Sequence, residues 1–450
     1  LLVDDSARLT ISGAAVVSGE LQMSPGTTLE VTGAGATFQA LAAAWISGAN
    51  LWAKAGGLLS LPTATHYSHS GTAANQHRSL LADGPNSRLE LPNLSAVFGG
   101  RYYNDRLFIT ASNSGVVDLS GARQILDPSD GDTNYRSIDV VATGASSRMQ
   151  LDALESIVDQ NGYDFGNGMY STLAARNGGT VVAPHLVELD GVNLEISQGG
   201  SLDLQTLTTL RDGRVQFNNA NLALPLLATI ANTTATFDGS DVSLPLLTKF
   251  ERSALTLDNG GTASAPSLAR IDASSFVVND GVTLSLPAAT SYAFESAGAN
   301  WHRVLQADGS GSRLELPNIR QIVGGHNYNN RLFVTASAGG VIDLSNASQI
   351  QDPSDGDGSY RSVDIVATGA GSRVELDALT EIRDRTAYDF GSGMYSTLAA
   401  RAGGTIDAPL LTSATGVNLE ISGGGALSTS QITQFVNGRI SLDGATADMS

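Results

Sequence analysis

The sequence contains no cysteine, so disulfide bonds do not hold this chain together. Lysine is nearly absent, with Lys54 and Lys249 as its only instances, and the formal net charge is −19. A nucleic-acid binder needs a basic stripe along one face, and this composition excludes one. No run of about 18 apolar residues is present, so we expect no membrane-spanning helix.

Proline is also sparse, at 13 residues, whereas glycine accounts for 50 of the 450 residues and hydrophobic residues for 42%. This balance excludes a disordered chain and is typical of many short strands joined by glycine turns. The first residues, LLVDDSARL, lack the basic region and the long apolar stretch of a signal peptide. They resemble the middle of a repeat, and we expect the chain to be part of a longer one.

A period of about 20 residues is clearest in residues 214–287, where a proline recurs at Pro225, Pro245, Pro266 and Pro287. Short segments of alternating apolar residues precede these prolines, and Gly, Asn or Asp turns precede the segments. A fixed period combined with this alternation predicts stacked β-coils rather than a globular domain. In one such coil the side chains expected to face the core are Val215, Phe217, Leu222, Leu224, Leu227 and Ile230.

A second, longer period of 225 residues lies over the first. Residues 87–93 (SRLELPN) return at 312–318, and residues 169–176 (MYSTLAAR) return at 394–401. The chain therefore predicts two cassettes of nine coils each, 1–225 and 226–450, in one continuous solenoid of about eighteen coils. The handedness of parallel crossovers favours right-handed winding.

Four successive coils of each cassette are longer than the rest. The extra residues are expected at about 66–79, 96–106, 125–136 and 156–171, and again at 292–303, 322–331, 350–361 and 382–396. Insertions at one phase of successive coils project from one face. We therefore expect a lobe of stacked loops in each cassette, at about 63–172 and 288–397.

The units of a glycine turn followed by a short strand carry a resemblance to a known class. They include residues 114–119 (SGVVDL), 145–151 (ASSRMQL), 199–204 (GGSLDL) and 311–316 (GSRLEL). The chain resembles the parallel β-helix repeats of large bacterial surface and secreted proteins, including filamentous adhesins. The segments LPNL (91–94) and LPLL (244–247) also resemble bacterial leucine-rich repeats. The asparagine ladder of that second class is missing, which favours the β-helix.

This resemblance implies an all-β fold at an extracellular or cell-surface location. The leading interpretation is a structural, non-enzymatic segment of a fibre, stalk or adhesin that assembles or continues end to end, with a glycan or a surface protein as a further partner. The alternative is a polysaccharide-binding module, or a polysaccharide lyase or hydrolase of the β-helix class, that acts through the loop lobe.

One candidate site for a cofactor is a pair of acidic loops. Each loop, DPSDGD, places three carboxylates around a glycine, and Ca²⁺ binds such oxygens. The candidate ligands are Asp127, Asp130 and Asp132 in the first cassette and Asp352, Asp355 and Asp357 in the second. The spacing is not that of an EF-hand, and the alternative is a solvated acidic turn.

The only histidine that is present in both cassettes offers a weak candidate for acid–base chemistry. The residues concerned are His77, Arg78 and Asp83, with His302, Arg303 and Asp308 as their counterparts. A structural histidine, with the arginine bonded to loop carbonyls, is the favoured interpretation.

Most tyrosines fall in the expected loops, including Tyr67 and Tyr292. Exposed rings can stack on sugars or fill a protein interface, and buried rings can form a small core within the lobe. The tyrosines predicted to bind a partner are Tyr102, Tyr103, Tyr135, Tyr163, Tyr170, Tyr328, Tyr360, Tyr388 and Tyr395.

Overall fold

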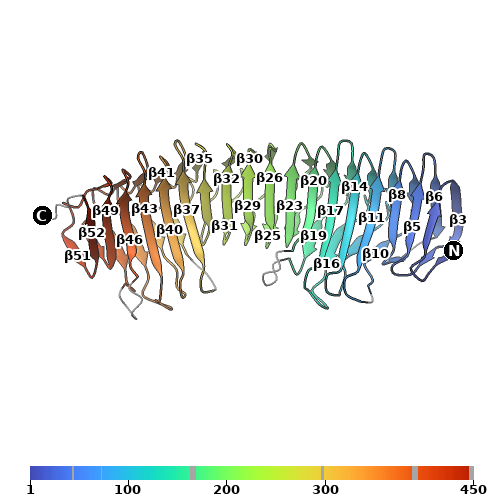
Figure 1. The fold of residues 1–450 in the computed structure, drawn as a ribbon, viewed down its shortest axis with the longest axis horizontal. Coiled ribbons are helices and arrows are strands. Elements are labelled where there is room, and N and C mark those ends of the chain that lie inside the picture. Colours follow the sequence, from blue (N-terminus) through green and yellow to red (C-terminus); the bar gives the residue numbers. More distant parts are fainter. Residues whose placement is uncertain (43–44, 72, 163–168, 295–297, 388–393, 445–450) are drawn as a thin grey trace. The chain divides into compact units, whose positions relative to one another are not determined.

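The structure is a computed structural model that describes the chain except for residues 43–44, 72, 163–168, 295–297, 388–393 and 445–450. Its strands form long, all-parallel sheets, which confirms the predicted parallel β-helix (Figure 1). The chain divides into two compact units, Leu1–Leu227 and Ala228–Ser450. No helix within the described ranges is long and apolar enough to cross a membrane.

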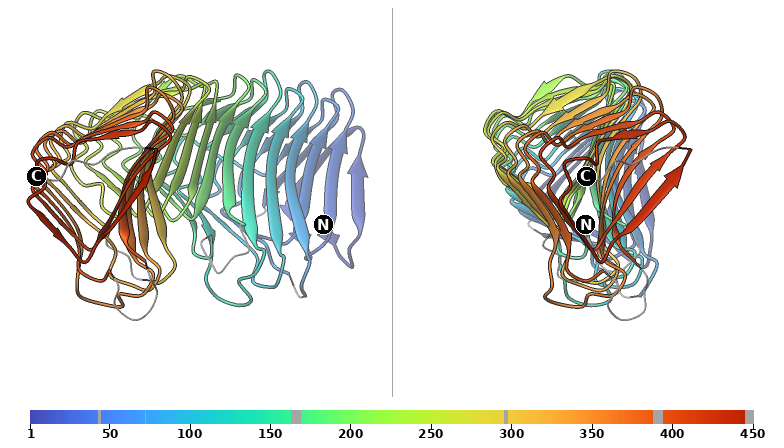
Figure 2. Two further views of the ribbon diagram at one scale, coloured as in Figure 1. Left: turned by 60° about the vertical axis from the view of Figure 1, so that its left-hand side comes forward. Right: turned by 90° about the vertical axis from the view of Figure 1, so that its left-hand side faces the viewer.

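Most coils run through three strands in turn, and these strands pair in parallel with their equivalents in the next coil. One coil of the first unit consists of β11 (His77–Asp83), β12 (Arg88–Glu90) and β13 (Ala96–Phe98). The three pair with β14 (Arg106–Ser112), β15 (Val116–Asp118) and β16 (Gln124–Asp127) of the following coil. Each unit therefore has three faces, named here the long-strand face, the second face and the third face in chain order (Figure 2).

In the first unit, the remaining strands extend the three faces in the same order. The long-strand face also contains β2 (Arg8–Ile11), β5 (Thr28–Thr32), β8 (Asn50–Lys54), β17 (Ser137–Thr143), β20 (Ser171–Arg176), β23 (Val192–Ser197) and β26 (Arg214–Asn218). The second face also contains β3 (Ala14–Glu20), β6 (Thr37–Ala42), β9 (Leu58–Ser60), β18 (Arg148–Gln150), β21 (Thr180–Val182) and β24 (Ser201–Leu202). The third face also contains β7 (Trp45–Ser47), β10 (His66–Ser68), β19 (Ser156–Asp159), β22 (Glu188–Asp190) and β25 (Thr209–Arg211). The short strands β1 (Leu2–Val3) and β4 (Gln22–Met23) pair with each other, and β27 (Leu222–Ala223) lies near the end of the unit.

The second unit repeats this arrangement. Its long-strand face contains β29 (Thr234–Asp238), β32 (Ala254–Asp258), β34 (Ser275–Val278), β37 (His302–Asp308), β40 (Arg331–Ser337), β43 (Ser362–Thr368), β46 (Ser396–Arg401), β49 (Val417–Ser422) and β52 (Arg439–Asp443). The second face contains β30 (Asp241–Ser243), β33 (Thr262–Ser264), β35 (Thr283–Ser285), β38 (Arg313–Glu315), β41 (Val341–Asp343), β44 (Arg373–Glu375), β47 (Thr405–Asp407) and β50 (Ala426–Leu427). The third face contains β28 (Thr229–Ala231), β31 (Lys249–Glu251), β36 (Ser291–Ala293), β39 (Gln321–Val323), β42 (Gln349–Asp352), β45 (Glu381–Asp384), β48 (Ser413–Thr415) and β51 (Gln434–Val436).

Along each strand, side chains point alternately inward and outward, and the inward ones form the core. In β14, Leu107, Ile109 and Ala111 are fully buried, and each lies in register with a buried apolar residue of β17. Burying one such large aliphatic side chain stabilises the fold by about 1.5–3 kcal/mol. The inward set predicted for the coil around residues 214–231 is confirmed with one exception, because Leu222 is only half-buried.

Buried serines close the turns between the long-strand face and the second face. The Ser87 hydroxyl donates to the Asp83 carbonyl, at 2.6 Å, and accepts the Gly56 N–H of the preceding coil, at 2.9 Å. Ser312 makes the same two bonds, at 2.6 Å and 2.9 Å. Each serine thus joins the backbones of two neighbouring coils through one donor and one acceptor.

The extra residues of the long coils all leave at the corner between the third face and the long-strand face. A single residue, Gly191, separates β22 from β23, whereas the decorated coils of the first unit insert residues 69–76, 99–105, 128–136 and 160–170 at this corner. The second unit inserts residues 294–301, 324–330, 353–361 and 385–395. The ranges expected from sequence began too early, because they included third-face strands. Tyr67 and Tyr292 lie on such strands and are buried in the core, so their assignment to the loops was wrong.

Candidate functional site

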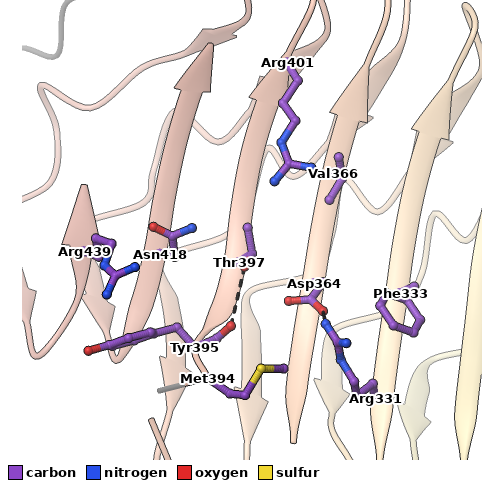
Figure 3. Close-up of a pocket in the computed structure, with 10 residues that line it drawn as sticks. All are labelled: Arg331, Phe333, Asp364, Val366, Met394, Tyr395, Thr397, Arg401, Asn418 and Arg439. Carbon is purple, nitrogen blue, oxygen red and sulfur yellow. Dashed lines mark hydrogen bonds and ion pairs between the residues drawn. The ribbon is translucent and has the colours of Figure 1, made fainter. Parts of the chain in front are cut away.

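The outer side of the long-strand face of the second unit carries a pocket of about 390 Å³. Its lining comes from β40, β43, β46, β49 and β52, together with two residues that precede β46 (Figure 3). We call this surface the arginine shelf. It is lined by Arg331, Phe333, Asp364, Val366, Met394, Tyr395, Thr397, Arg401, Asn418 and Arg439.

Strand register sets the order of the side chains across the shelf. Phe333, Asp364, Thr397, Asn418 and Arg439 occupy one register position on five successive coils. They face outward along β40 and β49 because the residues on either side of them are buried. Successive members of this row are about 4.8 Å apart, which is the spacing between neighbouring strands.

Two of the shelf arginines are held by neighbouring coils. Arg331 donates to the Ser362 hydroxyl at 3.0 Å and to the Asp364 carboxylate at 2.7 Å. Arg401 donates to both carboxylate oxygens of Glu420, at 2.7 and 2.6 Å. These last bonds raise the pKa of the Arg401 guanidinium and lower the pKa of the Glu420 carboxyl. The geometry of both guanidinium groups is therefore fixed before any ligand arrives.

The third arginine and the asparagine have groups that are not used within the protein. Arg439 is exposed and lies 5.6 Å from the centre of the Tyr395 ring, and the described residues offer it no ion-pair partner. The side-chain oxygen of Asn418 is buried and accepts no hydrogen bond from the described protein atoms. The shelf thus presents an uncompensated cation beside an unused hydrogen-bond acceptor.

The first unit carries the same ten residues at positions lower by 225. They are Arg106, Phe108, Asp139, Val141, Met169, Tyr170, Thr172, Arg176, Asn193 and Arg214. Their contacts also repeat, since Arg106 donates to Asp139 at 2.8 Å and Arg214 lies 5.7 Å from the Tyr170 ring. The side-chain oxygen of Asn193 is again buried and accepts no hydrogen bond from the described protein atoms. We therefore regard the two shelves as two copies of one site.

The lining of the shelf combines arginines with aromatic side chains. Its ten lining residues include three arginines and one aspartate, on a chain whose formal net charge is −19. None of the ten is a histidine or a cysteine. Because Arg331 and Arg401 are paired with Asp364 and Glu420, the positive charge that the shelf offers to an anion comes from Arg439, beside an aromatic ring.

A pair of tyrosines stands on the loops next to each shelf. The rings of Tyr103 and Tyr135 meet edge to face at 5.4 Å, and those of Tyr328 and Tyr360 repeat this contact at 5.4 Å. All four side chains are exposed. Tyr135 and Tyr360 both have a backbone φ of +60°, a strained conformation for a bulky residue that is typical of functional sites.

The other predicted tyrosines have separate positions. Tyr102 is exposed, but asparagine replaces it at position 327 of the second unit. Tyr170 and Tyr395 belong to the shelves, whereas Tyr163 and Tyr388 lie outside the described residues.

In the first acidic loop an arginine occupies the place considered for calcium. Asp127 is buried at the end of β16, and its carboxylate lies 3.6 Å from the Nε of buried Arg136. Arg136 also donates to the Asp130 carbonyl, at 2.7 Å, and to the Pro128 carbonyl. Burial raises the pKa of Asp127 to about 8, with the adjacent Asp159 adding to the rise and Arg136 opposing it.

The second acidic loop is built in the same way. Arg361 lies 3.2 Å from the Asp352 carboxylate and donates to the Asp355 carbonyl at 2.7 Å, and burial raises the pKa of Asp352 to about 7.

The outer carboxylates of these loops have partners of their own. Asp130 pairs with Arg101 and Asp355 pairs with His326. Asp132 and Asp357 accept backbone N–H groups of their own loops. Across the described part of the chain, no group of three or more His, Cys, Asp or Glu side chains is arranged to hold a metal ion.

The structure does not bring the candidate acid–base residues together. His77 begins the seven-residue strand β11 and Asp83 ends it, which separates them by roughly 20 Å. The His77 ring packs edge-on against Phe108 at 5.9 Å, and Asp83 accepts hydrogen bonds from the next coil. Arg78 is buried and donates to the His77 carbonyl at 3.0 Å.

The corresponding residues of the second unit have the same separation. His302 packs against Phe333 at 5.7 Å, and Asp308 accepts from the Ser337 hydroxyl at the other end of β37. The Arg303 guanidinium lies 4.6 Å from the Trp301 ring.

A buried polar pair at the root of the first loop was missed from sequence. The Nε2 of His69 lies 2.8 Å from the Gln76 carbonyl, and its Nδ1 lies 3.8 Å from the Asp105 carboxylate. Burial lowers the pKa of His69, which Asp105 opposes. In the second unit Phe294 and Asn330 replace the two residues together. This difference indicates a role in packing the loop rather than in a function that both units share.

No protein-family model and no curated protein matches the chain. The class of protein is therefore defined by the fold and the site: a parallel β-helix with a duplicated arginine shelf. Of the shelf residues, only Tyr170 and Tyr395 were among the site residues predicted from sequence. Two features of the sequence could have indicated the shelf residues: each is identical to the residue 225 positions away, and the strand pattern places them at outward positions.

Proposed function

We propose that this chain is a structural, non-enzymatic segment of an extracellular β-solenoid fibre, stalk or adhesin. The observation that carries this proposal is the exact repetition of a decorated surface on stacked coils: ten lining residues and their contacts recur in both units. A scaffold that displays several copies of one surface gains from avidity. An enzyme of this architecture would need one assembled catalytic group, and the candidate acid–base residues are too far apart to form one.

End-to-end association is supported by the outer strands. Within the described residues, strand β52 pairs with β49 alone and exposes Ile440 and Leu442. At the other end of the chain, Leu2 and Val16 are exposed. Open strand edges with apolar side chains accept a further strand, whether it comes from another copy or from more of the same chain.

The tyrosine pairs support lateral or partner contacts of the kind proposed. Each pair projects two exposed rings from the loop corner, and the rings contact each other edge to face. Tyrosines of this type are enriched at protein interfaces.

Sedimentation velocity over a wide range of concentrations tests the structural proposal. We expect the chain to associate as concentration rises, and the paired substitutions Ile440→Lys and Leu442→Lys to abolish association without changing the circular dichroism. The matched control is Val187→Lys, at an exposed apolar position away from β52. Monomers at every concentration, or association that the β52 substitutions leave intact, would contradict the proposal.

The second candidate function, a polysaccharide-binding module, is supported by the arginine shelf, since aromatic rings and fixed arginines are suited to a polar ring with an anionic group.

A further inference from the structure

We propose that each arginine shelf binds a saccharide that carries an isolated carboxylate, so that one chain binds two such sugars. This inference names a ligand class for the partner contacts of the proposed function, and it does not depend on end-to-end assembly.

The requirement for an anion comes from the arginines. Arg331 and Arg401 are already oriented by carboxylates of neighbouring strands, and each guanidinium has more donors than those bonds use. Arg439 has no carboxylate partner within the described residues and is exposed beside them. A ligand carboxylate beside Arg439 would supply the missing negative charge. A second carboxylate would do the same beside Arg214 in the first unit.

The requirement for a hydrogen-bond donor comes from the asparagine. The buried side-chain oxygen of Asn418 has no donor among the described protein atoms, and Asn193 repeats this in the first unit. A buried acceptor without a partner costs free energy, and a carboxylate alone cannot satisfy it. An anion without a hydroxyl or N–H donor, such as chloride or sulfate, would leave this oxygen without a partner.

The requirement for a ring comes from the apolar residues. Phe333 and Tyr395 lie in the same pocket as the arginines, and Val366 and Met394 complete its apolar part (Figure 3). A sugar ring presents hydroxyl groups at its edge and an apolar face that packs on aromatic side chains. A peptide is disfavoured at the centre of the shelf because both edges of β43 and β46 are already paired with neighbouring strands.

The negative net charge of the chain favours a ligand with a single, isolated anionic group. Each shelf is a small positive area on a chain with a formal net charge of −19. A polyanion would be repelled by the net negative charge of the chain. A single carboxylate on an otherwise neutral saccharide meets only the arginines.

Isothermal titration calorimetry with glucuronate tests this proposal, with glucuronamide and glucose as uncharged probes and heparin as a polyanion. We expect two equivalent sites per chain for glucuronate, and binding at least roughly tenfold weaker for each of the other three probes. Arg439→Ala and Arg214→Ala should each leave one site, and the double variant should leave none. The control is Arg148→Ala, at an exposed position on the second face.

A further variant separates binding from folding. Asn418→Leu should remove one of the two sites and raise the thermal midpoint of unfolding, because the buried unused acceptor is gone. Absence of glucuronate binding would overturn the inference, as would binding that the double arginine variant leaves intact or equal affinity for glucose. Each of these results leaves the sedimentation test unaffected, so the two proposals fail independently.

Discussion

The buried arginine of the acidic loop allows a quantitative test of how the decorated coils are stabilised. Arg136 faces Asp127 at 3.6 Å, lies close enough to Asp159 to influence its pKa, and donates to the Asp130 and Pro128 carbonyls. Arg136→Met keeps the length of the side chain and removes its charge and donors. Removing one partner of a buried ion pair costs about 3–5 kcal/mol, because the other charge is left uncompensated.

This cost should depend on pH, since burial raises the pKa of Asp127 to about 8. At pH 9 Asp127 is ionised and the full cost of Arg136→Met is expected. At pH 6 Asp127 is protonated and uncharged, so removing Arg136 leaves fewer buried charges without a partner. The loss of stability caused by Arg136→Met should therefore be smaller at pH 6. Adding Asp127→Asn to Arg136→Met should reproduce the smaller cost at both pH values.

Hydrogen exchange of residues 128–136 and of β16 and β17 measures this local stability directly, which suits a repeat protein whose coils need not unfold together. Arg361→Met provides the matched variant in the second unit and should act there alone. A loss below about 1 kcal/mol at pH 9, or the same loss at pH 6 and pH 9, would refute the reasoning.

Three further predictions follow from the same contacts. The raised pKa values of Asp127 and Asp352 mean that the folded chain holds their protons more tightly than the unfolded chain. Their stabilising contribution is therefore fully present below about pH 4 and is lost as pH rises to about 8. Urea unfolding of the wild type and of the variant with both aspartates changed to asparagine should show that the free energy of unfolding depends less on pH in the variant. Ser87→Ala leaves the Gly56 N–H without its acceptor and should lower the free energy of unfolding by about 1–3 kcal/mol, measured by urea unfolding, with Ser312→Ala giving the same loss. Adding calcium should leave the thermal midpoint of unfolding unchanged, because Arg136 and Arg361 already occupy the loop carbonyls; a rise in the midpoint on titration would show instead that calcium binds.

The sequence predicted the coil but placed the loops imperfectly, for a physical reason. Proline and glycine identify turns because they constrain or free the backbone, and Pro62 and Pro92 do follow second-face strands. The loops leave one strand later, after third-face strands of only three or four residues. Strands that short carry too little alternation to be distinguished from loop, and Tyr67 was therefore misplaced.

The shelf was harder to predict because its residues are polar and sit on strands. An arginine on the outer face of a β-strand ordinarily indicates a solvated surface, and Arg106, Arg176 and Arg214 are separated by many residues in the chain. Only the register of five adjacent coils brings them to one surface. The acidic loop shows the converse case, in which three carboxylates are close in sequence but Asp127 turns into the core.

Disulfide trapping tests the coil register on which the whole account depends, and a chain without cysteine suits the experiment. Thr110 of β14 lies directly beside Val141 of β17, whereas Ala174 of β20 is one coil further away. We predict that Thr110→Cys with Val141→Cys forms an intramolecular disulfide, and that Thr110→Cys with Ala174→Cys does not, since two coils span about 9.6 Å and a disulfide joins Cα atoms less than 7 Å apart. Failure of the first pair to cross-link, or efficient cross-linking of the second, would contradict the register and with it the shelf.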